Sequence, residues 1–324
     1  MIEQWRVARR VKAVTFEPPP VFIVGHWRSG TTFLHNLMSR DPAFCFPTIL
    51  DALRPYDFYP GPLEPISRWV LLRFLPARRP MDDVPLSPGL PQEDEMALAT
   101  MGAPSLFNCF YFPRRASRIF AEEVLFEGAD PTTLESWSNA LRYYTAKLAA
   151  LNPGRRLLLK NPAHSARIGQ LRALFPGAKF VHIHRHPFAV FQSTRKLYHS
   201  LLPLTALQDY EPHDIDEHIV SSYPQVMNRL LDGLAELPSD LSTTVSYEDL
   251  VEDATGTVER IYRELKLGEF DRVKPSIAAQ AGQAAPRFPS VGDLDQATAS
   301  RLAVLWAPVL TRLGYSPNSR RMAS

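Results

Sequence analysis

The chain has 324 residues, of which 45% are hydrophobic and 22% are charged, and these proportions are typical of a globular protein. Its formal net charge of +2 gives no reason to expect a nucleic acid or another polyanion as partner. The two cysteines stand far apart, so we expect free thiols and not a disulfide. Neither a membrane span nor a secretory signal core is visible, so we expect the protein in the cytoplasm.

Residues 1–17 are predicted to form a short basic helix. Arg6, Arg9, Arg10 and Lys12 alternate there with apolar residues. An ordinary solvated first helix explains this pattern, and contact with an anionic membrane surface is the alternative. The chain as a whole, 1–324, is expected to be one domain, either purely cytoplasmic or also in peripheral contact with a membrane, and its oligomeric state is left open.

The most informative stretch is VFIVGHWRSGTT, residues 21–32. An apolar run long enough for one buried strand is followed by a loop with two glycines, and then by a helical pattern. Such a loop can cradle phosphate because free backbone N–H groups and the positive end of the helix dipole face the anion. A strand-turn-helix corner that binds nothing is the alternative. The candidate anion-binding residues are Gly25, His26, Trp27, Arg28, Ser29, Gly30, Thr31 and Thr32.

The spacing of this loop almost matches that of the nucleotide triphosphatases. Those proteins need a lysine where Thr31 stands, whereas the cation here is Arg28, inside the loop. In addition, no predicted strand ends in an obvious acid that would bind Mg²⁺. A P-loop phosphotransferase or kinase is therefore an alternative that the sequence disfavours.

Residues 43–112 are expected to be an insertion that carries the pocket for a second substrate. The segment is rich in proline and aromatic residues, and long loops over an α/β sheet usually carry the binding pocket. Packing in the core is the competing interpretation of the aromatic residues. Three acids, residues 93–95, stand directly before an apolar run. They either complement a helix dipole or place one desolvated carboxylate as a general base, and the sequence does not say which acid points inward.

Two further predicted strands end in cations. Lys160 ends the strand at residues 156–160, and Arg185 follows the strand at residues 178–184. Open α/β sheets bind ligands at the carboxyl ends of their strands, so both side chains should face one crevice. Ser193 lies eight positions after Arg185 on the next helix, and we expect the two to meet one anion.

His182, His184 and His186 alternate along the third of these strands and its end. A metal site is conceivable, but no matching carboxylate or cysteine accompanies them. Strand packing and local hydrogen bonding are the favoured interpretation, and no metal is expected.

A fourth strand is predicted at residues 241–246, with helices at 214–236, interrupted at Pro224, at 253–266 and at 295–313. Strands and helices alternate along the whole chain. This pattern predicts an α/β fold with a P-loop-like parallel sheet and helices on both faces.

Five separated blocks between residues 21 and 254 resemble the PAPS-dependent sulfotransferase family, where PAPS is 3′-phosphoadenosine 5′-phosphosulfate. The family's 5′-phosphosulfate loop is matched by GHWRSGTT, its Lys-x-Pro block by LLLKNPAH, its 3′-phosphate block by FPGAKFVHIHRHPFAVFQST, and the block that closes the nucleotide site by SYEDLVED. A fifth block, RPMDDVPLSPGLPQEDE, is similar to a segment of bacterial sulfotransferases, including the branch that sulfates hydroxylated menaquinone.

The resemblance implies an enzyme that transfers a sulfuryl group from PAPS to an acceptor hydroxyl by in-line displacement. The loop with Arg28 and its two threonines would hold the 5′ end of the donor. Arg185 and Ser193, with Tyr247 nearby, would hold the 3′-phosphate. Lys160 and Arg28 would stabilise the charge on the leaving oxygen, so no metal is required.

The general base is the open part of this interpretation. Some relatives place a glutamate soon after the first helix, where this chain has only Asp51. The candidates, in order, are Glu93 and Glu95, then His164, then His26 and Asp51. The apolar character of residues 44–75 and 105–112 predicts a lipophilic alcohol or phenol as acceptor. A non-catalytic nucleotide-binding adaptor is a further alternative.

Overall fold

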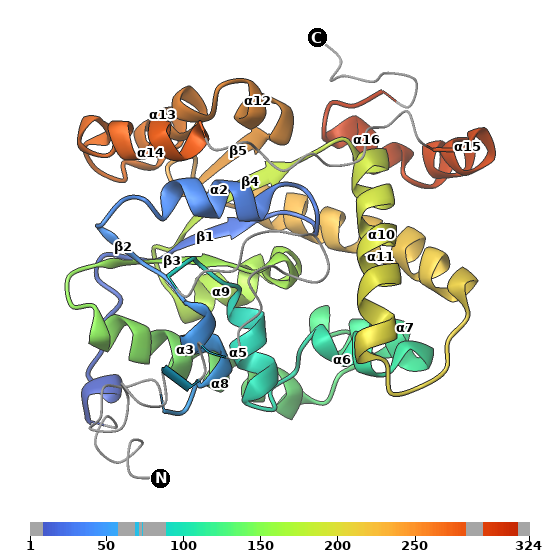
Figure 1. The fold of residues 1–324 in the computed structure, drawn as a ribbon, viewed down its shortest axis with the longest axis horizontal. Coiled ribbons are helices and arrows are strands. Elements are labelled where there is room, and N and C mark those ends of the chain that lie inside the picture. Colours follow the sequence, from blue (N-terminus) through green and yellow to red (C-terminus); the bar gives the residue numbers. More distant parts are fainter. Residues whose placement is uncertain (1–8, 58–68, 71–72, 74–88, 283–293, 317–324) are drawn as a thin grey trace.

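The computed structural model describes residues 9–57, 69–70, 73, 89–282 and 294–316. Its five strands form one parallel sheet in the order β2-β3-β1-β4-β5 (Figure 1). The predicted α/β fold with a parallel sheet is therefore confirmed. The strands are β1 (Val21–Val24), β2 (Phe44–Cys45), β3 (Arg156–Lys160), β4 (Lys179–His184) and β5 (Ser242–Ser246).

The central strand β1 decides where the crevice lies. Its neighbours are β3 on one side and β4 on the other. At such a point the chain connections diverge from the carboxyl end of the strand and leave a crevice for ligands. The glycine loop that follows β1 therefore lies at the position where an open α/β sheet binds its substrate.

Alternate residues of β1 pack into two separate parts of the core. Val21 and Ile23 join the cluster formed with α2, α12, α13 and α14, whereas Phe22 and Val24 join the cluster formed with α8, α9 and α11. Figure 1 shows these two groups of helices on opposite faces of the sheet. Burial on both faces explains why the strands are continuous apolar runs and do not alternate with polar residues.

The helices connect and cover these strands. The α-helices are α2 (Thr31–Met38), α3 (Ile49–Leu53), α5 (Asp94–Thr100), α6 (Phe107–Tyr111), α7 (Ala116–Ile119), α8 (Pro131–Leu151), α9 (Ile168–Leu174), α10 (Pro187–Thr205), α11 (Pro212–Ala235), α12 (Tyr247–Glu252), α13 (Ala254–Leu265), α14 (Lys274–Ala281), α15 (Gln296–Leu305) and α16 (Ala307–Arg312). Short 3₁₀ turns are η1 (Pro113–Arg115), η3 (Pro162–Ala166) and η4 (Phe270–Arg272), and η2 (Phe120–Val124) is a π-helical turn.

The expected interruption at Pro224 is wrong, because α11 runs through this residue without a break. A proline in a helix interior costs about 3 kcal/mol. Ile219, Val226 and Met227 of the same helix are buried in the core. Each such side chain contributes roughly 1.5–3 kcal/mol on burial, so packing outweighs the cost of the proline.

The helix expected at residues 295–313 is in fact two helices that meet at Trp306. The buried indole of Trp306 donates a hydrogen bond to the carbonyl oxygen of Val220, 2.9 Å away. Pro308 follows in the first turn of α16 and cannot continue the hydrogen-bond ladder of α15.

The N-terminal helix is also shorter than expected within the part that the structure describes. Residues 9–12 are helical and residues 13–17 are not, while residues 1–8 lie outside the described residues. Among the residues described, no helix combines the length and the apolar character needed to cross a bilayer.

Three buried histidines predict how the stability of the fold depends on pH. Burial lowers the pKa of His182 to about 3 and those of His26 and His218 to about 4, all from 6.5. The unfolded chain therefore binds more protons than the folded chain once the pH falls below 6.5. We expect the free energy of unfolding to drop by at least about 2 kcal/mol between pH 6.5 and pH 4.

Urea denaturation across this pH range measures the effect. Replacing His182 with glutamine should make the pH dependence shallower, whereas replacing the exposed His199 with glutamine should leave it unchanged. Equal slopes for both variants would show that burial of His182 does not govern this dependence.

Candidate active site

The loop between β1 and α2 is fixed by its two glycines. A side chain at Gly25 would meet the carbonyl oxygen of Ile183 at 2.2 Å, and one at Gly30 would meet the ring of Tyr247 at 2.3 Å. The backbone N–H of Gly25 donates to the hydroxyl of Ser165 at 2.9 Å, and that hydroxyl donates to the carbonyl of Gly25 at 3.0 Å. The loop is therefore clamped to both the neighbouring strand β4 and the turn that follows β3.

The groups of this loop that could hold an anion lie beyond these contacts of Gly25 and Gly30. Arg28 has a φ angle of 68°, in the left-handed region that residues with a side chain rarely adopt. Thr31 and Thr32 open α2, where the first backbone N–H groups of a helix have no carbonyl partner within it. The hydroxyl of Ser29 is buried and has no hydrogen-bond partner among the described residues. The loop thus offers a helix N-terminus, a hydroxyl and a cation to an anion.

Arg28 connects this loop to the second group of predicted site residues. Its Nε donates to Oγ of Ser193 on α10, 2.9 Å away. The guanidinium of Arg185, which follows β4, lies 4.9 Å from the ring centroid of Tyr247 at the start of α12. The two anion-binding groups that the sequence suggested are therefore contiguous, since Arg28 of one contacts Ser193 of the other.

Electrostatics supports the same grouping. Burial lowers the pKa of Arg185. The neighbouring Tyr247 and Glu248 oppose this shift, whereas the positive charge of Arg28 adds to it. Two guanidinium groups close enough to repel each other gain most from a shared anion, because an opposite charge removes the repulsion. The arrangement is suited to a ligand with more than one negative charge.

Lys160 lies between the loop and the acidic segment. Its ammonium group, 1% exposed, donates to Oγ1 of Thr32 at 3.3 Å and pairs with the carboxylate of Glu93. Glu93 precedes the first turn of α5 and its side chain is 31% exposed. The pair therefore connects the N-terminus of α2 to the N-terminus of α5, and it keeps one acid next to a buried cation and open to solvent.

The other two acids of residues 93–95 are sealed inside the protein. The carboxylate of Glu95 accepts hydrogen bonds from the hydroxyl of Ser105 (2.7 Å), the backbone N–H of Leu106 (2.6 Å) and the amide of Asn161 (2.6 Å). Oδ2 of Asp94 lies 2.6 Å from Nε2 of His164, and both side chains are fully buried. These contacts dock the start of α5 onto the turn that follows Lys160.

The remaining base candidates are also engaged in local structure. Nδ1 of His26 lies 3.0 Å from the carbonyl oxygen of Trp27, and its ring packs 4.7 Å from that of Tyr223. The carboxylate of Asp51 accepts hydrogen bonds from the backbone and hydroxyl of Thr48, which forms a capping box at α3. Glu93, in contrast, contacts Lys160 and remains partly exposed.

Sequence reasoning did not single out two residues that order the surroundings of Arg185. Glu248 accepts a hydrogen bond from the hydroxyl of Tyr315 at 3.1 Å, and its other oxygen accepts from the backbone N–H of His186 at 3.3 Å. The hydroxyl of Tyr315 lies 2.9 Å from Nδ1 of His184. Glu248 stands next to Tyr247 within SYEDLVED and could have been singled out there, whereas Tyr315 carried no sequence signal.

The three alternating histidines serve such local contacts. His182 lies 3.3 Å from the hydroxyl of Thr244, and the ring of His186 accepts a hydrogen bond from the backbone of Phe188 at the start of α10. Within the described ranges, no three His, Cys, Asp or Glu side chains come together as a metal site.

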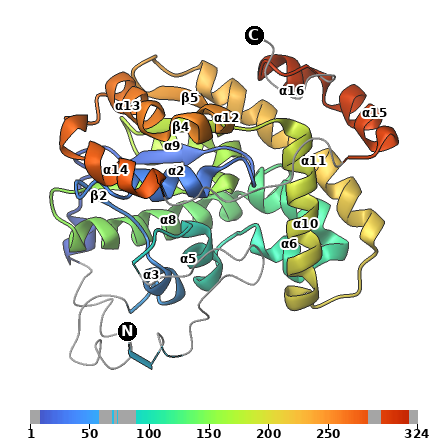
Figure 2. The same cartoon turned by 45° about the horizontal axis from the view of Figure 1, so that its top comes forward.

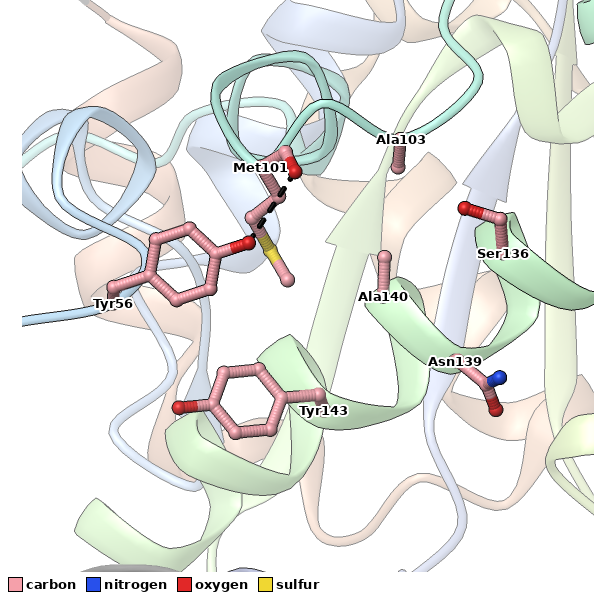
Figure 3. A pocket seen from close by; sticks show the side chains of 7 residues that line it. All are labelled: Tyr56, Met101, Ala103, Ser136, Asn139, Ala140 and Tyr143. Atoms are coloured by element: carbon pink, nitrogen blue, oxygen red, sulfur yellow. Dashed lines mark hydrogen bonds between the residues drawn. The ribbon is translucent and has the colours of Figure 1, made fainter. Parts of the chain in front are cut away.

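A separate cavity of about 290 Å³ lies at the other end of α5 (Figure 3). Tyr56 and Met101 face four residues of α8 across it, and the hydroxyl of Tyr56 donates to the carbonyl of Met101 at 3.3 Å. The lining residues are Tyr56, Met101, Ala103, Ser136, Asn139, Ala140 and Tyr143. None of them is a predicted site residue, and much of the expected acceptor segment, at residues 58–68, 71–72 and 74–88, lies outside the described residues.

Comparisons with known proteins agree with this geometry. A model of the sulfotransferase family matches residues 19–272. The omega-hydroxy-beta-dihydromenaquinone-9 sulfotransferase Stf3 of Mycobacterium bovis and that of Mycobacterium tuberculosis are each 32% identical to the chain over 317 residues, which cover 95% of this chain and 78% of each relative.

Solved structures show the same fold. Sulfotransferase STF9 from Mycobacterium avium superposes with a TM-score of 0.76 at 19% identity, covering 97% of this chain and 81% of that one. STF1 from Mycobacterium tuberculosis has a TM-score of 0.63 at 18% identity, with 95% and 80% covered. The family match over most of the chain and the extended identity to Stf3 establish that this chain belongs to the sulfotransferase family and is an enzyme of sulfuryl transfer.

Proposed function

We propose that this sulfotransferase moves a sulfuryl group from PAPS to the hydroxyl of a lipophilic small-molecule or lipid acceptor by in-line displacement. The observation that carries the proposal is the position of Lys160. Its ammonium group contacts Thr32, at the start of α2, on one side and Glu93 on the other. A cation and a base thus flank the position where the two substrates would meet.

The described residues fit a donor with two anionic ends. The N-terminus of α2 and the buried hydroxyl of Ser29 suit the phosphosulfate end. Arg185, Ser193 and Tyr247 suit the 3′-phosphate. Arg28 lies between the two groups and would contact both ends of one molecule.

In the proposed reaction, the acceptor oxygen forms a bond to sulfur while the bond from sulfur to the bridging phosphate oxygen breaks. Glu93 accepts the acceptor proton, and the electron pair stays on the phosphate oxygen. Lys160 and Arg28 stabilise the charge that develops there, because fixed cations in a site with little water interact strongly with it. We interpret Glu95 and His164 as positioning residues, since their hydrogen bonds hold α5 and leave no face open to an acceptor.

Two other functions that the sequence left open are not supported. A P-loop kinase needs a lysine where Thr31 stands, and the family match is to sulfotransferases. A nucleotide-binding adaptor needs no base beside a buried cation, whereas Glu93 and Lys160 form such a pair.

The acceptor class rests on the aromatic segments and on the relatives. The Stf3 proteins are named for a hydroxylated menaquinone, which supports a lipophilic acceptor for this chain as well. The test compares turnover on a long-chain prenyl alcohol, a simple phenol and an oligosaccharide at matched concentration. We expect the prenyl alcohol to be the best acceptor, and a preference for the oligosaccharide would overturn the proposal.

We also propose that the chain acts as one cytoplasmic domain that meets its acceptor at a membrane surface. The single sheet and its two core clusters, which draw on helices from most of the described chain, support one domain. The lipophilic acceptor provides the reason for membrane contact.

Replacing Arg185 with alanine should weaken the binding of adenosine 3′,5′-bisphosphate by roughly ten- to 150-fold, because charge-assisted hydrogen bonds contribute about 1.5–3 kcal/mol. Titration calorimetry measures the affinity directly. The matched control replaces Arg195, which is partly exposed on α10 and pairs with Asp216, and this variant should bind normally. Unchanged binding in a folded Arg185 variant would remove this residue from the site.

A further inference from the structure

Three exposed apolar side chains gather where α10 ends beside α6. Phe112, at the end of α6, is 37% exposed, while Leu204 in the last turn of α10 and Leu207 just beyond it are 67% and 73% exposed. The backbone N–H of Leu207 donates to the carbonyl of Tyr111 at 2.9 Å, which holds the two segments together. Figures 1 and 2 both show the end of α10 next to α6. We call Phe112, Leu204 and Leu207 the α6–α10 surface.

Positive charge borders the α6–α10 surface on its α6 side. Arg114 and Arg115 are exposed in η1, directly after Phe112. Lys196 is exposed two turns before Leu204 on the same side of α10, since residues four apart share a helix face. Two exposed acids, Asp209 and Glu211, lie on the loop towards α11. Apolar side chains next to cations match a bilayer surface with anionic headgroups.

Further basic charge on the same side is partly neutralised. Arg118 of α7 is exposed, and its Nε pairs with Glu122 at 2.9 Å. Arg114 and Arg115 are therefore the arginines of this segment with which an anionic surface would interact most directly.

A row of aromatic rings connects α6 to the loop between β1 and α2. The ring of Trp27 lies 6.3 Å from that of Phe120, which lies 5.4 Å from that of His218. The row continues from His218 to Tyr198 at 5.9 Å and from Tyr198 to Phe110 of α6 at 5.0 Å. A row of buried, packed rings thus extends from the loop that contains Trp27 to α6, which Phe112 follows directly.

The α6–α10 surface is also close enough to the donor site to serve it. Ser193 and Leu204 both lie on α10, eleven residues apart. At a rise of 1.5 Å per residue they are separated by about 17 Å. A lipophilic molecule with one end in a bilayer can span this distance with its reactive end at the site.

We propose that the α6–α10 surface docks the enzyme on an anionic membrane and there admits the lipophilic acceptor. Phe112, Leu204 and Leu207 enter the boundary between headgroups and acyl chains, and Arg114 and Arg115 contact the headgroups. The role in acceptor delivery rests on the proposed function, whereas docking itself does not depend on catalysis.

Vesicle flotation of the full chain tests docking. Vesicles of phosphatidylglycerol and phosphatidylcholine should bind the protein, and vesicles of phosphatidylcholine alone should bind it less. The L204S/L207S variant should lose most of its binding, and R114Q/R115Q should lose about fivefold for each charge removed. The matched control is V304S/L305S, which removes an apolar pair of similar exposure on α15 and should bind like the original protein.

Turnover separates docking from the proposed function. With a soluble phenol as acceptor, L204S/L207S should react like the original protein, whereas its rate on a prenyl alcohol embedded in vesicles should fall at least fivefold. Absence of vesicle binding by the original protein, or equal loss in L204S/L207S and V304S/L305S, would overturn docking. A lower molar mass of L204S/L207S in light scattering would instead identify this surface as a contact between copies of the chain. Normal flotation without any sulfuryl transfer would refute the proposed function and leave docking in place.

Discussion

Replacing Lys160 with methionine is expected to lower the turnover number by about 10²–10³-fold, the loss typical for removal of one group that stabilises developing charge. The ammonium group is buried at the end of β3 and contacts both Thr32 and Glu93. An interaction that strengthens as charge develops on the leaving oxygen affects the turnover number far more than donor binding. Methionine keeps an unbranched side chain of similar length and removes both the charge and the hydrogen-bond donors.

Steady-state rates and donor affinity should be measured on the same preparations. Lys274 offers a matched control, because it is half exposed on α14 and pairs with Glu259 at 3.6 Å. Its methionine variant should have normal turnover. If the Lys160 variant turned over normally and only bound the donor more weakly, Lys160 would be a binding residue and not a catalytic one.

Replacing Glu93 with glutamine should lower the turnover number by about 10²–10⁴-fold, the contribution that a positioned general base usually makes. Glutamine retains a hydrogen-bond acceptor for Lys160, so the geometry of the site should persist while the proton acceptor is lost. Because the partner Lys160 is buried and loses its counter-charge, we expect the melting temperature to fall as well, so activity is expressed per folded molecule.

The neighbouring acid is the control for this assignment. Replacing Glu95 with glutamine disturbs a buried carboxylate that accepts three hydrogen bonds, so the free energy of unfolding should fall by about 1–3 kcal/mol. Activity per folded molecule should fall less than tenfold. A larger loss of activity in the Glu95 variant than in the Glu93 variant, at equal folded fraction, would reverse the two roles.

Features set by neighbouring residues could be predicted from the sequence. The strand, glycine loop and helix at residues 21–38 appear where they were expected, because an apolar run, two glycines and a helical pattern follow each other directly. The start of α8 is likewise set by neighbouring residues, since the side chain of Asp130 caps the backbone N–H of Thr132 at 2.8 Å and Pro131 opens the helix.

Features set by distant residues could not be predicted. The clamp of Gly25 by Ser165 joins positions 140 residues apart, and Tyr315 reaches His184 across 131 residues. The choice among the acids at 93–95 depends on which side chains meet Ser105, Asn161 and Lys160, and no local pattern encodes this. Pro224 shows the same limit, since the packing of α11 overrides a strong local signal.

The most direct test of the central claim follows the transferred group itself. The protein is incubated with a prenyl alcohol and either PAPS labelled in its sulfuryl group or ATP labelled in its γ-phosphate, each with and without EDTA. Because Arg28, Lys160 and Arg185 supply the positive charge, we predict label transfer from PAPS that survives EDTA, and none from ATP. Transfer from ATP, transfer from PAPS that EDTA abolishes, or binding of the donor without any transfer would contradict the account.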